Sequence, residues 1–274
     1  MIDLALVKAA LKEDLAGGVD VTSVSTISTD AQLTAEFVAR DSGVIAGIEM
    51  AQAVLTEVGL SNIEVLVKDG ATAKAGEVLI RVTGNARAIL LAERTALNFL
   101  GHLSGIATLT SKWVDEVAGT DCKVRDTRKT TPGWRELEKF AVRMGGGTNH
   151  RMSLSDAALI KDNHIAAAGG VKAAFNAVRS AFPEAPIEIE VDTLEQLAEV
   201  LPLKPDLVLL DNMTPEQCQA AVKLVAGQAK LEASGGITIE QAREFAQTGV
   251  DYIAIGALTH SAKNFDIGLD VRSK

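Results

Sequence analysis

Basic side chains crowd into one stretch of this acidic chain, between positions 125 and 161. They are Arg125, Arg128, Lys129, Arg135, Lys139, Arg143, His150, Arg151 and Lys161. Arginine binds carboxylates through two parallel hydrogen bonds, whereas lysine supplies a compact point charge. Four of these groups flank expected strand ends or follow the glycine turn at 145–147: Arg128, Lys129, Arg151 and Lys161. Their convergence predicts a ligand with more than one negative charge. The remaining helix charges, Arg135, Lys139 and Arg143, are expected to be solvated.

Two carboxylates follow the basic stretch, each at the end of an apolar run. Glu190 and Asp211 would be costly there if they were buried without a partner. One interpretation is structural ion pairing with the nearby lysines. The other is that they accept hydrogen bonds from sugar hydroxyls and help to hold Mg²⁺, largely through substrate and water.

Two glycine turns come later in the chain. Ser234-Gly235-Gly236 precedes a helix that Thr238 would cap, and Gly256-Ala257 follows Ile255 at the end of the last apolar run. Backbone amides in such turns can approach a phosphate closely, and a helix N-terminus favours negative charge. The turns therefore predict a phosphate site.

The elements that must position these groups repeat one theme: a short apolar run, a polar residue and a helix. The runs are Cys122–Arg125, Ala157–Ile160, Ile187–Val191, Leu207–Leu210, Leu231–Ala233 and Tyr252–Ile255. Spacings of roughly 20 to 35 residues are typical of a parallel sheet built from βα units. Three helix starts pair a threonine with a glutamine three residues later, at Thr193, Thr214 and Thr238. No G-x-G-x-x-G follows a first strand, so a barrel is favoured, with its active site at the carboxyl ends of the strands.

The first hundred residues predict a separate α/β unit. We expect a helix from Leu4 that ends at Gly17-Gly18, followed by strands at Leu33–Arg40, Ile63–Val67 and Val78–Val82. From Ala86 to Val117 the pattern is helical, with a break expected at Gly101 and Gly105. The predicted fold is an N-terminal mixed α/β sandwich domain over 1–104 and a C-terminal TIM-like α/β barrel over 105–274.

Composition excludes several classes of protein. A formal charge of -9 argues against a nucleic-acid binder, and 47% hydrophobic residues suffice for a large core. No apolar stretch is long enough for a membrane span, and the charged opening segment does not resemble a signal peptide. The two cysteines, Cys122 and Cys218, and the four histidines lack zinc-type spacing. We therefore expect a cytoplasmic protein without zinc.

Six motifs together resemble the quinolinate phosphoribosyltransferase family, over essentially the whole chain and most specifically in its second half. They are Asp126–Gly133, Gly145–Arg151 around Asn149-His150, Ile160–His164, Glu190–Asp192, Leu210–Met213 and Glu232–Gly236. The resemblance implies a pentosyltransferase that moves phosphoribose from phosphoribosyl pyrophosphate (PRPP) to the ring nitrogen of quinolinate. Loss of CO₂ then gives nicotinate mononucleotide and pyrophosphate in NAD biosynthesis, with Mg²⁺ as cofactor.

The resemblance also implies roles for individual residues. Those placed around quinolinate and pyrophosphate are Arg128, Lys129, His150, Arg151 and Lys161. Those placed at the 5′-phosphate are Ser234, Gly235, Gly236 and Gly256. Thr127, Ile255 and Ala257 are expected to bind substrate as well. Glu190 and Asp211 fall at the ribose and the metal, and with Lys129 and Lys161 they form the catalytic set. Arg94 resembles the arginine that the family lends to a neighbouring subunit's site, which implies a homodimer and leaves further assembly into hexamers open.

Three alternatives remain open from the residues alone. A phosphoribosyltransferase of the same fold could act on another acceptor, such as nicotinate. A lysine at a strand end, such as Lys161, is also the usual nucleophile of Schiff-base lyases built on barrels. The third alternative is a binding protein without catalytic activity.

Overall fold

The computed structural model describes residues 2–272, which divide into two compact units. The first consists of the chain up to Ser111, the segment Glu136–Gly146 and the chain from Ser261 onwards; the second consists of Lys112–Arg135 and Gly147–His260. The sequence-based boundary after residue 104 lies within helix α4 (Ala86–Glu116). The first unit also takes in two later segments. The C-terminal strand pairs with a strand of the N-terminal sheet, and the segment Glu136–Gly146 packs against residues His102 and Ala107.

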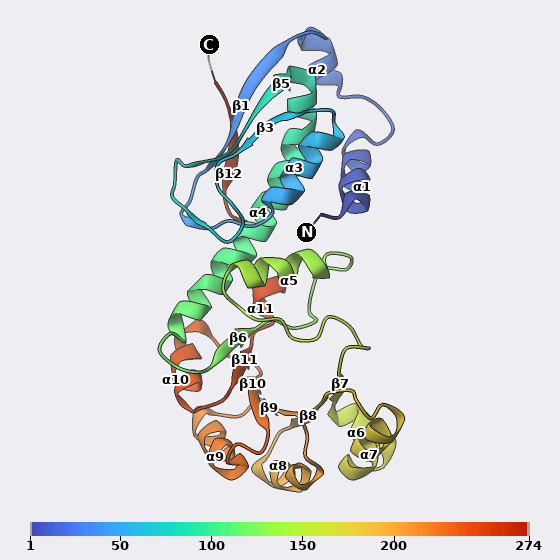
Figure 1. Ribbon diagram of the computed structural model, residues 1–274, viewed down its shortest axis with the longest axis vertical. Helices are drawn as coiled ribbons and strands as arrows, with labels where there is room; N and C mark the ends of the chain where they lie inside the picture. Colours follow the sequence, from blue (N-terminus) through green and yellow to red (C-terminus); the bar gives the residue numbers. More distant parts are fainter. Residues whose placement is uncertain (1, 273–274) are drawn as a thin grey trace. The chain divides into compact units, whose positions relative to one another are not determined.

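The first unit is built on a four-stranded antiparallel sheet with the strand order β12-β1-β5-β3. Its strands are β1 (Gln32–Ala39), β3 (Asn62–Val65), β5 (Val78–Asn85) and β12 (Ile267–Val271), and a separate two-stranded sheet joins β2 (Gly43–Val44) to β4 (Thr72–Ala73). The three strands that were predicted for this region are confirmed as β1, β3 and β5. Its helices are α1 (Leu4–Leu15), α2 (Val21–Thr26), α3 (Ile48–Glu57), α4 (Ala86–Glu116) and α5 (Arg135–Met144). Figure 1 shows α3 and α4 lying along the sheet that contains β1 and β5.

Helix α4 runs without interruption from Ala86 to Glu116, so the expected break at Gly101 and Gly105 is wrong. A Cβ atom on Gly105 would lie 2.1 Å from the backbone oxygen of Lys263, and one on Gly101 would lie 3.0 Å from that of Phe265. These glycines therefore serve close packing of the 263–265 backbone against the helix. Helical periodicity cannot distinguish this role from a helix stop.

Helix α5 corrects a second expectation. Lys139, predicted as a solvated charge, is 0% exposed, as is the neighbouring Glu138, which lies 2.9 Å from His102 Nε2 on α4. The helix packs closely within the first unit, since a Cβ atom on Gly145 would lie 2.3 Å from the Ala107 backbone oxygen. Arg143 is exposed as predicted. Alternating charges in the sequence do not reveal that a neighbouring helix covers this face.

The second unit contains a six-stranded parallel sheet with the order β6-β11-β10-β9-β8-β7. Its strands are β6 (Lys123–Arg125), β7 (Ala158–Ile160), β8 (Ile187–Val191), β9 (Leu207–Asp211), β10 (Lys230–Ser234) and β11 (Tyr252–Ala254). Each of the six predicted runs is therefore a strand. β6 and β7 are the two edge strands of this curved sheet and are not paired with each other, so the six described strands form an open barrel.

Helices alternate with these strands and lie along the outside of the sheet (Figure 1). They are α6 (Asp162–Ala168), α7 (Val171–Ala181), α8 (Leu194–Val200), α9 (Pro215–Val225), α10 (Ala242–Gln247) and α11 (Ala257–His260), with the short 3-10 helices η1 (Leu201–Leu203) and η2 (Ile239–Gln241). The capping boxes predicted at Thr193, Thr214 and Thr238 are all present. Among the described residues, no helix combines the length and apolar character needed to cross a bilayer.

Candidate active site

A cavity of about 630 Å³ opens at the carboxyl ends of the strands in the second unit. Its lining consists of Thr127, Arg128, Lys129, His150, Arg151, Leu159, Lys161, Glu190, Leu209, Asp211, Asn212, Glu232, Ser234, Gly235, Gly236, Ala254 and Gly256. The carboxyl ends of parallel strands meet at one edge of a barrel, which is why residues that are distant in sequence converge here. The structure thus brings together most of the predicted site residues.

The cationic part of the cavity centres on two arginines. Burial lowers the pKa of the Arg151 guanidinium, and the positive charge of Arg128 lowers it further. The guanidinium of Arg151 donates to the Ala157 backbone oxygen at 2.8 Å, and the Nε atom of Arg128 is buried without a hydrogen-bond partner among the described residues. Two like charges held close together in a partly desolvated cavity favour an anionic ligand.

The two lysines differ in their surroundings. Lys161, just after β7, forms an ion pair with Glu190 at the end of β8; the lysine side chain is 44% exposed and the glutamate side chain 11%. Lys129 is exposed at the cavity rim, and its backbone N–H donates to Thr127 Oγ1 at 3.1 Å. Thr259 Oγ1 on α11 donates to the Lys129 backbone oxygen at 2.8 Å, which anchors this loop. Thr127 is thus a turn residue as well as a lining residue.

Asp211 ends β9 beside the lysines. Burial raises the pKa of its carboxyl group, Lys161 and Lys129 oppose this shift, and the negative charges of Asp192 and Asp162 add to it. Its Oδ2 atom accepts from Asn212 Nδ2 at 2.6 Å. The predicted ion pair with a lysine is present at Glu190, and Asp211 lines the cavity; the predicted role of the two carboxylates toward a sugar and Mg²⁺ stays a prediction.

The glycine turn after β10 needs its glycines. Gly235 has φ +101, and a Cβ atom there would lie 2.2 Å from Asn212 Oδ1 and 2.8 Å from the Asn212 backbone nitrogen. Asn212 has a positive φ of 54 and donates its N–H to the Ser234 backbone oxygen at 2.9 Å. The two turns are therefore interlocked, and the turn at Gly235 can present bare backbone to a ligand. Asn212 was not predicted as a site residue, although it directly follows the predicted Asp211.

The second glycine turn is also crowded. A Cβ atom on Gly256 would lie 3.1 Å from Lys129 Cδ and 3.2 Å from His260 Nε2. His260, at the end of α11, lies close to this turn but does not line the cavity. Ile255 and Ala257 do not line the cavity: Ile255 is 3% exposed and donates its N–H to the Arg125 backbone oxygen, and Ala257 begins α11.

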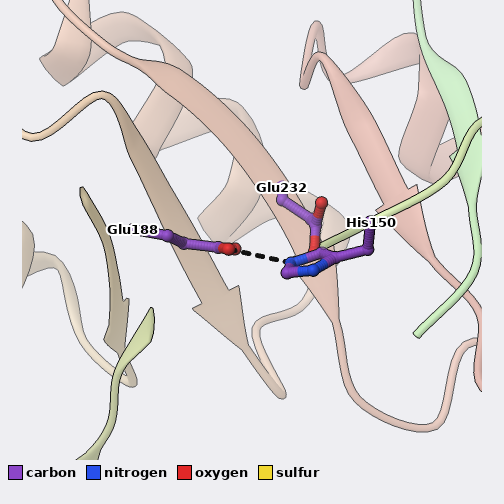
Figure 2. Close-up of side chains that lie close together, drawn as sticks. All are labelled: His150, Glu188 and Glu232. Carbon is purple, nitrogen blue, oxygen red and sulfur yellow. Dashed lines mark ion pairs between the residues drawn. The ribbon is translucent and has the colours of Figure 1, made fainter. Parts of the chain in front are cut away.

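A buried polar cluster lies at the inner end of the cavity, and Figure 2 shows its central part. The Nε2 atom of His150 lies 2.8 Å from Glu188 Oε2 and 3.5 Å from Glu232 Oε1. The other oxygen of Glu232 accepts from Arg125 at 2.7 Å, and the Arg125 guanidinium lies 4.1 Å from the centre of the Tyr252 ring. Burial raises the pKa of Glu232 to about 7, and the negative charge of Glu188 raises it as well.

Sequence reasoning missed both glutamates of this cluster. Glu188 precedes Glu190 by two residues, and Glu232 precedes Ser234 by two residues. Strand side chains alternate with period two, so each glutamate shares a face with a predicted site residue. That spacing was the available signal, because Ile187, Ile189 and Val191 occupy the opposite face of β8.

Arg94, expected to reach a neighbouring subunit, is exposed on α4 in the first unit and does not line the cavity. Arg94 therefore takes no part in the cavity of its own chain.

A parallel α/β barrel with cations, carboxylates and glycine turns at its strand ends has the features expected of an enzyme of the phosphoribosyltransferase class. Two family models match the chain: "Quinolinate phosphoribosyl transferase, N-terminal domain" over residues 20–104 and "Quinolinate phosphoribosyl transferase, C-terminal domain" over residues 106–270. The chain belongs to the quinolinate phosphoribosyltransferase family.

Individual relatives agree with this assignment. The nicotinate-nucleotide pyrophosphorylase [carboxylating] of Mycobacterium leprae is 52% identical over 97% of this chain and 95% of that protein. The quinolinate phosphoribosyltransferase [decarboxylating] 2b of Nicotiana tabacum is 42% identical over 97% of this chain and 81% of that protein. The solved nicotinate-nucleotide pyrophosphorylase of Francisella tularensis is 39% identical, with a TM-score of 0.94 over 98% of this chain and 95% of that one.

Proposed function

We propose that this protein transfers phosphoribose from PRPP to the ring nitrogen of quinolinate and releases CO₂ and pyrophosphate, so that nicotinate mononucleotide is formed. The observation that supports this most directly is the composition of one cavity. Paired guanidinium groups at Arg128 and Arg151 face the same space as the glycine turn at Gly235. Such a cavity suits two anionic ligands, a dicarboxylate and a sugar phosphate, better than one.

The arginines bind and orient the acceptor. The buried Nε atom of Arg128 has no protein partner among the described residues, and a substrate carboxylate would satisfy it. Two guanidinium groups match two ring carboxylates, because each can form a bidentate pair. Holding the ring nitrogen in line with the ribose carbon supplies much of the rate enhancement, since attack needs orientation more than it needs a base.

The carboxylates serve the sugar and the metal. Departure of pyrophosphate builds positive charge on the ribose, and the carboxylate of Asp211 stabilises that charge. Mg²⁺ prefers oxygen ligands and substrate phosphates, and the donor set of Glu190 and Asp211 fits this preference. We propose that these two residues hold the ion largely through substrate and water. When bound, Mg²⁺ neutralises charge on the leaving pyrophosphate.

The lysines are placed to assist the later step. After transfer the ring nitrogen is positive, so the electron pair of the broken C–C bond stays on the adjacent ring carbon, which then takes up a proton as CO₂ leaves. The ammonium groups of Lys129 and Lys161 can stabilise this charge or supply the proton. We propose that one of them does so; Lys161 already lies in contact with Glu190.

The assembly and location of the enzyme are part of the same proposal. We propose a homodimer in which Arg94 reaches the partner's site; its exposure on α4 is compatible with that role. We also propose a cytoplasmic location. Cys122 and Cys218 are free and buried, and burial raises their pKa values to about 12 and about 11, which keeps the thiols protonated.

One assay tests the proposed function: nicotinate mononucleotide formation from quinolinate and PRPP, with and without Mg²⁺, beside a parallel reaction with nicotinate. We expect turnover of quinolinate only, because a single ring carboxylate leaves one guanidinium unmatched. Arg128→Lys should raise the KM for quinolinate about 10-fold or more through loss of the bidentate pair. Arg243→Lys, an exposed arginine on α10, is the matched control. Equal turnover of nicotinate, or no product from quinolinate, would refute the proposal.

A further inference from the structure

The interior of the barrel holds charged groups where such barrels usually hold branched apolar side chains. Glu188 is 5% exposed and Glu232 is 0% exposed, and they come from strands β8 and β10 on either side of β9. Burying two carboxylates near one another is costly, and Arg125 is paired with only one of them. The arrangement therefore needs a reason beyond packing.

The hydrogen bonds of His150 indicate that reason. Its Nδ1 atom accepts the backbone N–H of Arg151 at 2.8 Å, so Nδ1 has no proton of its own. The proton must then be on Nε2, which lies 2.8 Å from the carboxylate of Glu188. Both ring nitrogens are thus engaged within the protein, and the imidazole is fixed as one tautomer.

The same hydrogen bonds fix Arg151. His150 anchors the backbone of Arg151, while the Ala157 carbonyl anchors its guanidinium at 2.8 Å. The backbone N–H of His150 is in turn bonded to the buried Asp126 at 2.8 Å. The position of this guanidinium is therefore linked through the imidazole to the carboxylate of Glu188.

We propose that Glu188 is a positioning residue that holds His150 as its Nε2–H tautomer, so that its Nδ1 sets the backbone of Arg151 and aims that guanidinium at the acceptor. Glu188 accepts the hydrogen bond of the imidazole Nε2–H. Glu232 is held by Arg125, and its other oxygen lies 3.5 Å from Nε2 without a hydrogen bond among the described residues. This inference rests on the proposed function, in which Arg151 binds quinolinate.

The three side chains His150, Glu188 and Glu232 could also be considered as ligands for a metal ion, since their donor atoms lie within 4.8 Å of one another. The tautomer argues against this. A metal would need an unprotonated Nε2, which moves the proton to Nδ1, where it would face the N–H of Arg151. Arg125 already supplies positive charge to Glu232.

The test combines kinetics with histidine spectroscopy on the full-length protein. In Glu188→Leu we expect the KM for quinolinate to rise about 10-fold or more, while the KM for PRPP changes by less than about twofold. Glu188→Gln keeps an oxygen that can accept the Nε2 proton, so it should restore most of the affinity for quinolinate. An unchanged quinolinate KM in Glu188→Leu would overturn the proposal, as would equal increases in both KM values.

Nitrogen-15 NMR of labelled histidine, with His150→Gln to assign the signal, reads the tautomer without any substrate. We expect the Nε2–H form in the wild type and in Glu188→Gln, and a tautomer mixture in Glu188→Leu. A wild-type signal from the Nδ1–H form or from imidazolium would overturn the proposal even if Glu188→Leu fails to fold. Failure of the proposed function is distinct, because the wild-type protein would then make no nicotinate mononucleotide whatever its tautomer.

Discussion

Replacing Gly235 by alanine tests the interlocked turns at the phosphate end of the cavity. The residue has φ +101, a conformation that costs an L-residue about 1–3 kcal/mol. The new Cβ would also lie 2.2 Å from Asn212 Oδ1 and 2.8 Å from the Asn212 backbone nitrogen. The Asn212 side chain can rotate, but its backbone nitrogen is held by the 2.9 Å bond to Ser234, so overpacking adds about 1–3 kcal/mol. We expect Gly235→Ala to destabilise the second unit by about 2–6 kcal/mol.

Gly236→Ala is the matched control, because the adjacent glycine has φ +60 and a Cβ atom added there would meet nothing within 4 Å. Its cost should be about 1–2 kcal/mol. Urea unfolding gives the free energy of unfolding of both variants, provided that the slope of this free energy against urea concentration is the same in each. The KM for PRPP reports on the phosphate site. Gly235→Ala should raise that KM because the turn must shift to accept the methyl group. Equal unfolding midpoints and equal PRPP affinity in the two variants would refute the argument.

Three further predictions concern single side chains. Asp211→Asn should lower kcat by about 10-fold or more and weaken the dependence on Mg²⁺, measured by titrating the metal; unchanged metal dependence would contradict its role. Burial raises the pKa of Glu232 from 4.5 to about 7, so its stabilising contribution is complete below pH 4.5 and is lost as the pH rises to about 7. Urea unfolding should therefore show the wild type losing stability relative to Glu232→Gln across that range, and parallel pH profiles would contradict it. Mixing Arg94→Ala with Lys161→Met should restore about a quarter of wild-type activity, because random dimers contain one intact site in half of the molecules; no recovery would exclude a shared site.

Local sequence patterns determined most of the secondary structure of the second unit. All six predicted runs are strands, and the three capping boxes at Thr193, Thr214 and Thr238 are present. These features depend on neighbours in the chain: apolar periodicity defines a buried strand, and a threonine three residues before a glutamine defines a helix start. Because parallel strands share one carboxyl edge, the order of strand-end residues was sufficient to place Arg128, Asp211 and most of the other predicted residues around one cavity.

Contacts between distant segments decided the rest. Gly105 was expected to break a helix, but the backbone of Lys263 approaches it so closely that only glycine fits. Lys139 was expected on the surface, but packing within the first unit buries it. The strand β12 pairs with β1 across more than two hundred positions of sequence, as the match of Ala39 with Ile267 illustrates.

The buried cluster of His150, Glu188 and Glu232 shows most clearly what local sequence determines and what contacts between distant segments decide. The sequence determined that Glu188 shares a strand face with Glu190, since side chains alternate with period two. Only the tertiary structure decided that this face points at His150, and that Glu232 approaches the same ring from another strand. Which charges meet, and how far burial shifts their protonation, depends on the curvature and register of the parallel sheet, and these arise from packing between elements that are distant in the chain.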